Sequence, residues 1–145
     1  MAQNVIKGLL SALVILNAVQ AQANEKLVLT LRVGPYFSEQ VRDGQVIGHG
    51  QISMREAHLG YQVWLDALKS GAAPNQYVIT GKNNARHELR VVIGRDGWIP
   101  DSKTGNGVIK QTSDIQANFN IVALGNQTVP ADEYRIIAQG AYLEP

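Results

Sequence analysis

The stretch Glu133–Leu143, EYRIIAQGAYL, decides the fold predicted for this chain. Apolar and β-favouring residues at extended spacing are typical of a strand, and the turn-like Val129-Pro130-Ala131-Asp132 precedes them. Only Glu144 and Pro145 follow this strand in the sequence. If the chain folds as a β-sandwich, no later segment is left to cover the free edge of this strand. The functional hypothesis depends on that absence.

The upstream segments favour an antiparallel sandwich, because apolar residues recur in them at every second position. Residues 114–124 show the clearest alternation, with five apolar residues predicted to point inward: Ile115, Ala117, Phe119, Ile121 and Ala123. The other predicted strands span residues 27–33, 45–57, 61–66, 76–80 and 86–93. The fold class predicted is all-β, an immunoglobulin-like sandwich of roughly seven strands with no helix of normal length.

Two aromatic residues favour a sandwich over a barrel. Trp64 lies on the third predicted strand, and Tyr134 opens the last strand just after a proline-containing turn, where a tyrosine corner would lie. Residues 99–113, rich in Gly, Asp, Lys, Thr and Asn, are predicted to form a long exposed loop and the most mobile region. Residues 65–69 are the best candidate for a single helical turn.

The first 23 residues have the pattern of a secretory signal peptide. Lys7 supplies the positive charge, residues 8–16 form an apolar run too short to span a bilayer, and Ala21-Gln22-Ala23 fits a small-x-small cleavage site. Cleavage after Ala23 would leave residues 24–145 as one compact domain beyond the inner membrane. The alternative, a buried or membrane-anchoring helix, is disfavoured because no further apolar segment long enough to span a bilayer follows.

Charge and composition exclude several classes of function. The chain has 13 Lys and Arg against 12 Asp and Glu, and the loss of Lys7 would make the two numbers equal. A chain without net charge has no long-range attraction to nucleic acid or acidic lipid. The chain has no Cys, which excludes thiol catalysis and thiolate metal sites.

No catalytic residue, cofactor site or metal site is predicted. His49, His58 and His87 are dispersed, and the His87-Glu88 pair lacks the second His of a zinc-protease helix. Neither a Gly-x-Ser-x-Gly nucleophile motif nor a phosphate-binding or calcium-binding loop is present. A hydrolase is therefore disfavoured.

A sandwich without its closing strand would leave backbone N–H and C=O groups unpaired and core side chains exposed. Bacteria solve this problem by donor-strand complementation, in which another polypeptide inserts the missing strand. The alternative is that residues 27–33 close the sandwich themselves and the domain folds alone as a secreted binding module. In the first case the predicted groove for the donor strand is lined by Leu29, Leu31, Val33, Tyr134, Ile136, Ala138, Gly140 and Tyr142.

Several motifs resemble, in the same order, the AfaD/AggB-type invasin family of fimbrial minor subunits. They are Arg55-Glu56-Ala57-His58 before Val63-Trp64, residues 86–91 with Asp96-Gly97-Trp98, Gly125-Asn126-Gln127 and Glu133-Tyr134-Arg135. The likeness spans almost the whole chain from about Leu29.

This resemblance implies an incomplete immunoglobulin-like fold and export through the periplasm. It also implies a periplasmic fimbrial chaperone, an outer-membrane usher and a major fimbrial subunit that donates a strand. Members are displayed at the fimbrial tip or the bacterial cell surface, and they act in adhesion to or invasion of host cells. The implied host receptor is an integrin or a matrix protein.

The chain departs from the family pattern at one pair of positions. The resemblance implies a pair of cysteines where Met54 and Tyr142 stand here, and the loss of that disulfide could cost a few kcal/mol. Ahead of the first strand, Asn24-Glu25-Lys26 is too short to serve as a donor segment. We therefore expect the subunit to accept a donor strand and give none, which places it at a tip.

Three acidic residues, Asp66, Asp96 and Asp101, are the speculative candidates for receptor contact. Asp66 belongs to Leu65-Asp66-Ala67, which resembles an integrin-type acidic motif. The Arg-Asp-Gly tripeptides at 42–44 and 95–97 differ in order from the integrin tripeptide, and Asp-Gly turn chemistry explains both. For Asp66, which ends a predicted strand, a solvated polar residue is the alternative.

Overall fold

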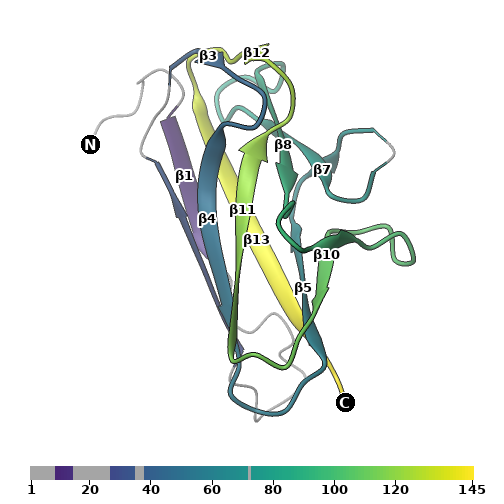
Figure 1. Cartoon of the computed structure of the whole chain (residues 1–145). Helices are drawn as coiled ribbons and strands as arrows, with labels where there is room; N and C mark the ends of the chain where they lie inside the picture. The colour runs from purple at the N-terminus through teal and green to yellow at the C-terminus, as the bar shows by residue number, and fades with distance from the viewer. Residues whose placement is uncertain (1–8, 15–26, 35–37, 72) are drawn as a thin grey trace.

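The computed structural model describes residues 9–14, 27–34, 38–71 and 73–145, and this part of the chain contains strands and no helix (Figure 1). The strands are β1 (Leu9–Val14), β2 (Val28–Val33), β3 (Gln40–Val41), β4 (Val46–Ser53), β5 (Gly60–Leu65), β6 (Leu68–Lys69), β7 (Gln76–Thr80), β8 (Glu88–Ile93), β9 (Ile99–Pro100), β10 (Val108–Gln111), β11 (Gln116–Ala123), β12 (Gln127–Thr128) and β13 (Glu133–Leu143).

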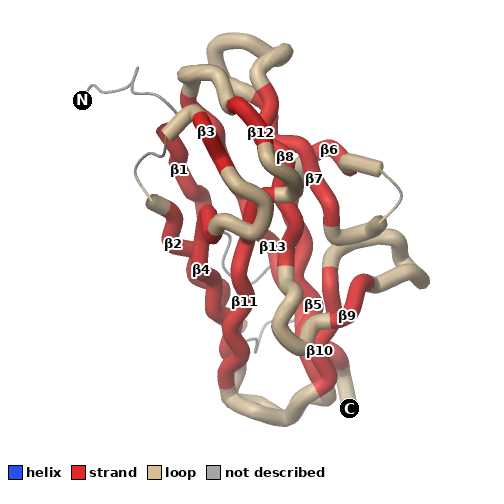
Figure 2. Tube along the Cα trace, turned by 45° about the horizontal axis from the view of Figure 1, so that its top comes forward, coloured by secondary structure: helices blue, strands red, loops and turns tan. Residues whose placement is uncertain are grey.

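Two sheets face one another and enclose the core. One has the order β1-β13-β5-β10-β9 and the other has the order β2-β4-β11-β8-β7-β6, while β12 and β3 form a small separate ladder. Neighbouring strands are antiparallel except for β1 and β13, which run parallel. The predicted all-β sandwich is confirmed, and Figure 2 shows its strands running along the length of the molecule.

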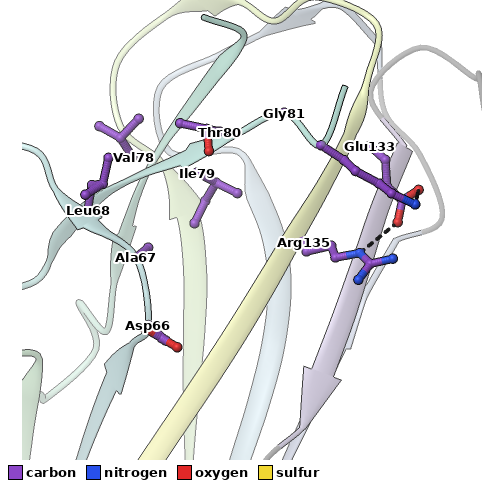
Figure 3. A pocket seen from close by; sticks show the side chains of 10 residues that line it. Asp66, Ala67, Leu68, Val78, Ile79, Thr80, Gly81, Glu133 and Arg135 are labelled. Carbon is purple, nitrogen blue, oxygen red and sulfur yellow. Dashed lines mark hydrogen bonds and ion pairs between the residues drawn. The ribbon is translucent and has the colours of Figure 1, made fainter. Parts of the chain in front are cut away.

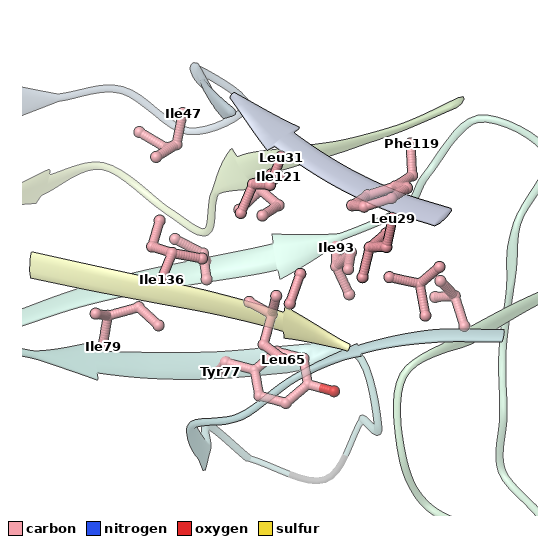
Figure 4. Packing of buried hydrophobic residues seen from close by; sticks show 14 of the residues in the cluster. Leu29, Leu31, Ile47, Leu65, Tyr77, Ile79, Ile93, Phe119, Ile121 and Ile136 are labelled. Atoms are coloured by element: carbon pink, nitrogen blue, oxygen red, sulfur yellow. The ribbon is translucent and has the colours of Figure 1, made fainter. Parts of the chain in front are cut away.

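The core follows from the alternation of side chains along each strand. On β13, Tyr134, Ile136 and Ala138 are fully buried, and on β2 Leu29 and Leu31 are buried. Figure 4 shows Leu29, Leu31 and Ile136 of this core between the sheets. Burial of one such aliphatic side chain stabilises the fold by about 1.5–3 kcal/mol, so the interface between the sheets carries most of the stability.

The predicted tyrosine corner is present at the start of β13. The Tyr134 hydroxyl donates a hydrogen bond to the carbonyl oxygen of Pro130 at 2.5 Å. Burial, together with the negative charge of Asp132, raises the pKa of Tyr134 to about 12. The phenol therefore stays protonated and anchors the turn before β13 to the strand itself.

The buried tryptophan of the sandwich is Trp98, whereas Trp64 lies on β5, the strand predicted to contain it. Trp98 is 5% exposed, its indole Nε1 donates to the Asn118 carbonyl at 2.8 Å, and its ring meets the Phe119 ring edge-on. Trp64 is only half-buried, because Val63 and Leu65 take the inward positions of β5.

Residues 99–113 are not one long exposed loop, which corrects the prediction. They contain β9 and β10, and β10 pairs with β5. Gly107 has φ +72°, and a Cβ atom there would lie 2.1 Å from the Val63 carbonyl oxygen. A glycine thus permits the close approach of this segment to β5.

Two local predictions also differ from the structure. Ile115 was predicted to point inward but is 58% exposed, because β11 begins only at Gln116. Residues 65–69 contain no helical turn, since β6 forms there and pairs with β7.

Candidate functional site: the seam between β2 and β13

The seam between β2 and β13 is the place where the two sheets would be left open. β2 pairs with β4 in the second sheet, from Val28 opposite Ser53 to Val33 opposite Gly48. It therefore does not pair with β13. The alternative prediction, in which residues 27–33 close the sandwich, is wrong. β13 pairs with β5 through residues 138–143.

β1 occupies this seam. It runs parallel to β13, with Leu9 opposite Glu133 and Val14 opposite Ala138, and it also lies against β2. Among the described residues from 27 onward, none pairs with this edge of β13. The strand that covers the edge thus comes from the segment predicted to be a signal peptide, which is the central observation about this site.

The structure brings the eight predicted groove residues to the inner faces of two strands. Gly140 on β13 lies against the other sheet, since a Cβ atom there would be 2.8 Å from Ile52 Cδ1 and 3.6 Å from Leu29 Cδ2. Tyr134, Ile136, Ala138, Leu29 and Leu31 are buried. Val33 and Tyr142 are half-buried and pack against the same core. Their role in holding a donor strand stays a prediction.

A buried carboxylate fixes the beginning of β13, and the sequence patterns did not reveal it. The Asp132 side chain is fully buried and accepts hydrogen bonds from His87 Nδ1 at 2.9 Å, Asn83 N at 3.0 Å, Asn83 Nδ2 at 2.9 Å and Glu133 N at 2.6 Å. Burial raises the pKa of Asp132, but these hydrogen bonds outweigh it and hold the pKa below its ordinary value. The turn between β7 and β8 is thereby tied to β13.

The three candidate receptor contacts lie in different environments. Asp66 is exposed and lines a hollow of about 510 Å³ beside Leu68 and Arg135, and Figure 3 shows Arg135 directed toward Glu133. The Arg135 Nε atom lies 3.1 Å from Glu133 Oε2. Asp96 is exposed, and its carboxylate accepts a hydrogen bond from Asn120 at 3.4 Å. The structure therefore does not bring Asp66 and Asp96 into one site.

Asp101 is buried, which corrects its selection as a surface contact. It is 6% exposed and accepts hydrogen bonds from Gln62 Nε2 at 2.9 Å, Lys103 N at 3.2 Å and the Thr104 hydroxyl. The Thr104 hydrogen bond is the largest cause that lowers the pKa of Asp101, and it acts against burial. This carboxylate orders its own loop and is not available to a receptor.

The three histidines lie at separate places. His49 Nδ1 is 2.8 Å from Asn120 Oδ1, whereas His87 contacts Asp132. Both ring nitrogens of His58 face carbonyl oxygens, those of Glu56 at 2.7 Å and Asp114 at 2.8 Å. In the part of the chain that the structure describes, no three His, Asp or Glu side chains are grouped to hold a metal ion. The described residues also include no helix that could cross a membrane.

Comparison with known proteins identifies the family. Residues 37–140 match the family of the Enterobacteria AfaD invasin protein. The chain belongs to the AfaD invasin family. Protein AfaD of Escherichia coli is 39% identical over 107 residues, covering 73% of this chain and 72% of AfaD. Protein AggB of Escherichia coli is 34% identical over 116 residues, covering 79% of each. The resemblance predicted from the motifs is confirmed.

Solved structures related to the AfaD family have the same fold. The Salmonella SafD adhesin is 38% identical with a TM-score of 0.78, over 83% of this chain and 90% of SafD. The structure of AggB, described as the minor subunit of aggregative adherence fimbriae type I, has a TM-score of 0.71 over 81% of this chain and 85% of AggB. The incomplete immunoglobulin-like fold of fimbrial subunits is thus the fold of this member of the AfaD family.

The two positions at which the resemblance implies cysteines are occupied by packed side chains here. Met54 is 4% exposed, and Tyr142 is half-buried against the core. Met54 and Tyr142 each lie two residues beyond the close approach of Ile52 and Gly140. Side chains packed against the common core therefore occupy both positions at which the resemblance implies a disulfide.

Proposed function

We propose that this chain is a minor, tip-located subunit of a fimbria assembled by the chaperone/usher pathway. It accepts a donor strand in the seam between β2 and β13, and it presents a surface for adhesion to or invasion of host cells. Membership of the AfaD family supports this role, as does the similarity to SafD, an adhesin, and AggB, a minor fimbrial subunit.

One observation carries the proposal. The strand that covers the free edge of β13 is Leu9–Val14, a segment of apolar sequence that lies within the predicted signal peptide. If cleavage after Ala23 removes that peptide, the same edge needs a strand from another polypeptide. An edge with unpaired backbone groups beside exposed core side chains is a site for β-strand addition.

The partners follow from this order of events. A periplasmic chaperone would cover the edge after export, and the outer-membrane usher would exchange the chaperone for a strand of the major fimbrial subunit. The assembled subunit would then lie at the fimbrial tip on the bacterial surface, where it meets a host receptor such as an integrin or a matrix protein. Enzymatic activity is not part of this proposal.

Refolding separates this function from a self-sufficient secreted module. Residues 24–145 should unfold at a lower temperature than the uncleaved chain 1–145, and a peptide of residues 8–16 should restore stability when added to the shorter chain. We expect a rise in melting temperature of about 10 °C or more, because several apolar side chains worth about 1.5–3 kcal/mol each regain a partner.

The matched control peptide carries Leu10→Pro and Ala12→Pro, which remove backbone donors and prevent strand pairing. It should leave the melting temperature unchanged. If residues 24–145 formed a stable monomer whose melting temperature neither peptide raised, the proposal would be ruled out and the self-sufficient module favoured.

A further inference from the structure

The outer face of β2, β4 and β11 carries an ordered array of polar side chains away from the seam. The registers place Thr30, Gln51 and Asn118 in one row across the three strands, and Arg32, His49 and Asn120 in the next row. Five of these six side chains are exposed and Asn120 is half-buried. Figure 2 shows the three strands side by side at one side of the molecule. We name these six residues the polar face.

A shallow hollow lies between the two rows. Its volume is about 660 Å³, within the range of roughly 300–1,000 Å³ typical of small-ligand sites. The two rows are about 7 Å apart, since they are two residues apart along each strand. Gly50 lies between the rows on the middle strand, and a Cβ atom there would be 2.0 Å from the Phe119 ring on the inner side. Glycine at this position lets Phe119 pack beneath the hollow in the observed register.

The side chains on β4 and β11 are held in place before any ligand arrives. Gln51 Nε2 donates to Asn118 Oδ1 at 3.3 Å, and His49 Nδ1 lies 2.8 Å from Asn120 Oδ1. Asn120 Nδ2 donates to Asp96 Oδ2 at 3.4 Å. Groups fixed in this way lose less conformational entropy on binding than free side chains do.

The charges on this face are asymmetric. Arg32, on the β2 side, is the one Lys or Arg that lines the hollow, and the three ion pairs among the described residues do not include it. Asp96 lies at the opposite end, beside Asn120. A ligand with a negative group should therefore place that group near Arg32 and away from Asp96.

We infer that the polar face binds a sugar that carries an anionic group. The anion would pair with the Arg32 guanidinium, and the sugar hydroxyls would exchange hydrogen bonds with Gln51 and Asn118, whose amides both donate and accept. This inference rests on the proposed function, because it gives the displayed subunit a class of ligand. The face lies outside the core, so a strand inserted in the seam between β2 and β13 would leave it open.

The test is a titration of the uncleaved chain 1–145, followed by NMR. The probes are sialyllactose, which carries a carboxylate, a sulfated heparin disaccharide, and neutral lactose. We expect saturable binding of at least one anionic probe, with an affinity at least tenfold higher than that of lactose. The anionic probe that binds more tightly identifies the anionic group as a carboxylate or a sulfate. Equal or absent binding of all three probes would overturn the inference.

Two variants locate the site. Arg32→Gln should weaken the affinity for the anionic probe about tenfold and leave the affinity for lactose unchanged. Arg86→Gln, which removes the same charge from an exposed turn, should change neither affinity. Both residues are exposed, so the melting temperatures should match that of the wild type, and this comparison excludes misfolding. Wild-type affinity in Arg32→Gln would overturn the inference. A chain that accepts a donor strand but binds no sugar would contradict this inference and leave the proposed function standing.

Discussion

The carboxylate of Asp132 accepts a hydrogen bond from His87 Nδ1 at 2.9 Å and joins residues 45 apart in the sequence. Because the Asp132 side chain is fully buried and accepts further hydrogen bonds from Asn83 and Glu133, its removal would leave several part-buried donors without their acceptor. We predict that Asp132→Ala lowers the free energy of unfolding by about 3–5 kcal/mol. Urea denaturation of the uncleaved chain measures this loss. Asp96→Ala, at an exposed carboxylate, should cost less than about 1 kcal/mol.

The buried carboxylates also predict how stability depends on pH. The pKa values of Asp132 and Asp101 both lie below their ordinary value of 3.8. A carboxylate whose pKa is lower in the folded state contributes stability above the unfolded pKa and loses it as the pH falls through the folded pKa. The melting temperature should therefore fall with decreasing pH below about pH 4.

The double variant Asp101→Asn, Asp132→Asn provides the control for this pH effect. Its melting temperature should be lower at pH 7 and should vary less between pH 2 and pH 5. If the wild type and the double variant lost stability in parallel over this range, other groups would be responsible.

The tyrosine corner leads to a third prediction. Tyr134→Phe removes the hydrogen bond to the Pro130 carbonyl and keeps the ring, so the expected cost is about 1 kcal/mol. Absorbance titration should also find one tyrosine with a pKa near 12 that is missing in Tyr134→Phe. A Tyr134→Phe protein as stable as the wild type would show that the corner is dispensable.

The sequence predicted the strands well because side-chain alternation is a local property. β13 has the predicted bounds, Glu133–Leu143, since a turn precedes it and its buried residues alternate. The same pattern located the strands that contain the eight groove residues. Only the structure shows that β2 pairs with β4 and that β1 pairs with β13, because strand pairing depends on distant parts of the chain.

The remaining errors have the same cause. Asp101 stands in a polar, glycine-containing segment typical of a loop, and its burial depends on Gln62, which is 39 residues away. Asp132 and His87 form one cluster that neither sequence neighbourhood suggests. The polar face could not be predicted either, because its two rows depend on the register of three strands. Tertiary hydrogen bonds of this kind leave no periodic signal in the sequence.

Close packing of β13 against the opposite sheet yields a fourth prediction. Gly140→Val would place side-chain atoms where Ile52 Cδ1 is 2.8 Å from the Cβ position, so overpacking should cost about 1–3 kcal/mol or more. It should also hinder a donor strand, since Gly140 lies in the predicted groove. Ala141→Val, on the other face of β13, should cost little. Equal stability of the two variants would contradict the packing argument.

The final prediction concerns the positions at which family members are inferred to carry a disulfide. Met54 is buried, Tyr142 packs against the same core, and both lie two residues beyond the contact between Ile52 and Gly140. The double variant Met54→Cys, Tyr142→Cys should form a disulfide under oxidising conditions and stabilise the uncleaved chain by about 2–4 kcal/mol. Non-reducing mass spectrometry detects the bond, and thermal melts with and without reductant measure its effect. Each single variant should lack the reductant-sensitive gain, and two free thiols in the oxidised double variant would show that these side chains do not meet.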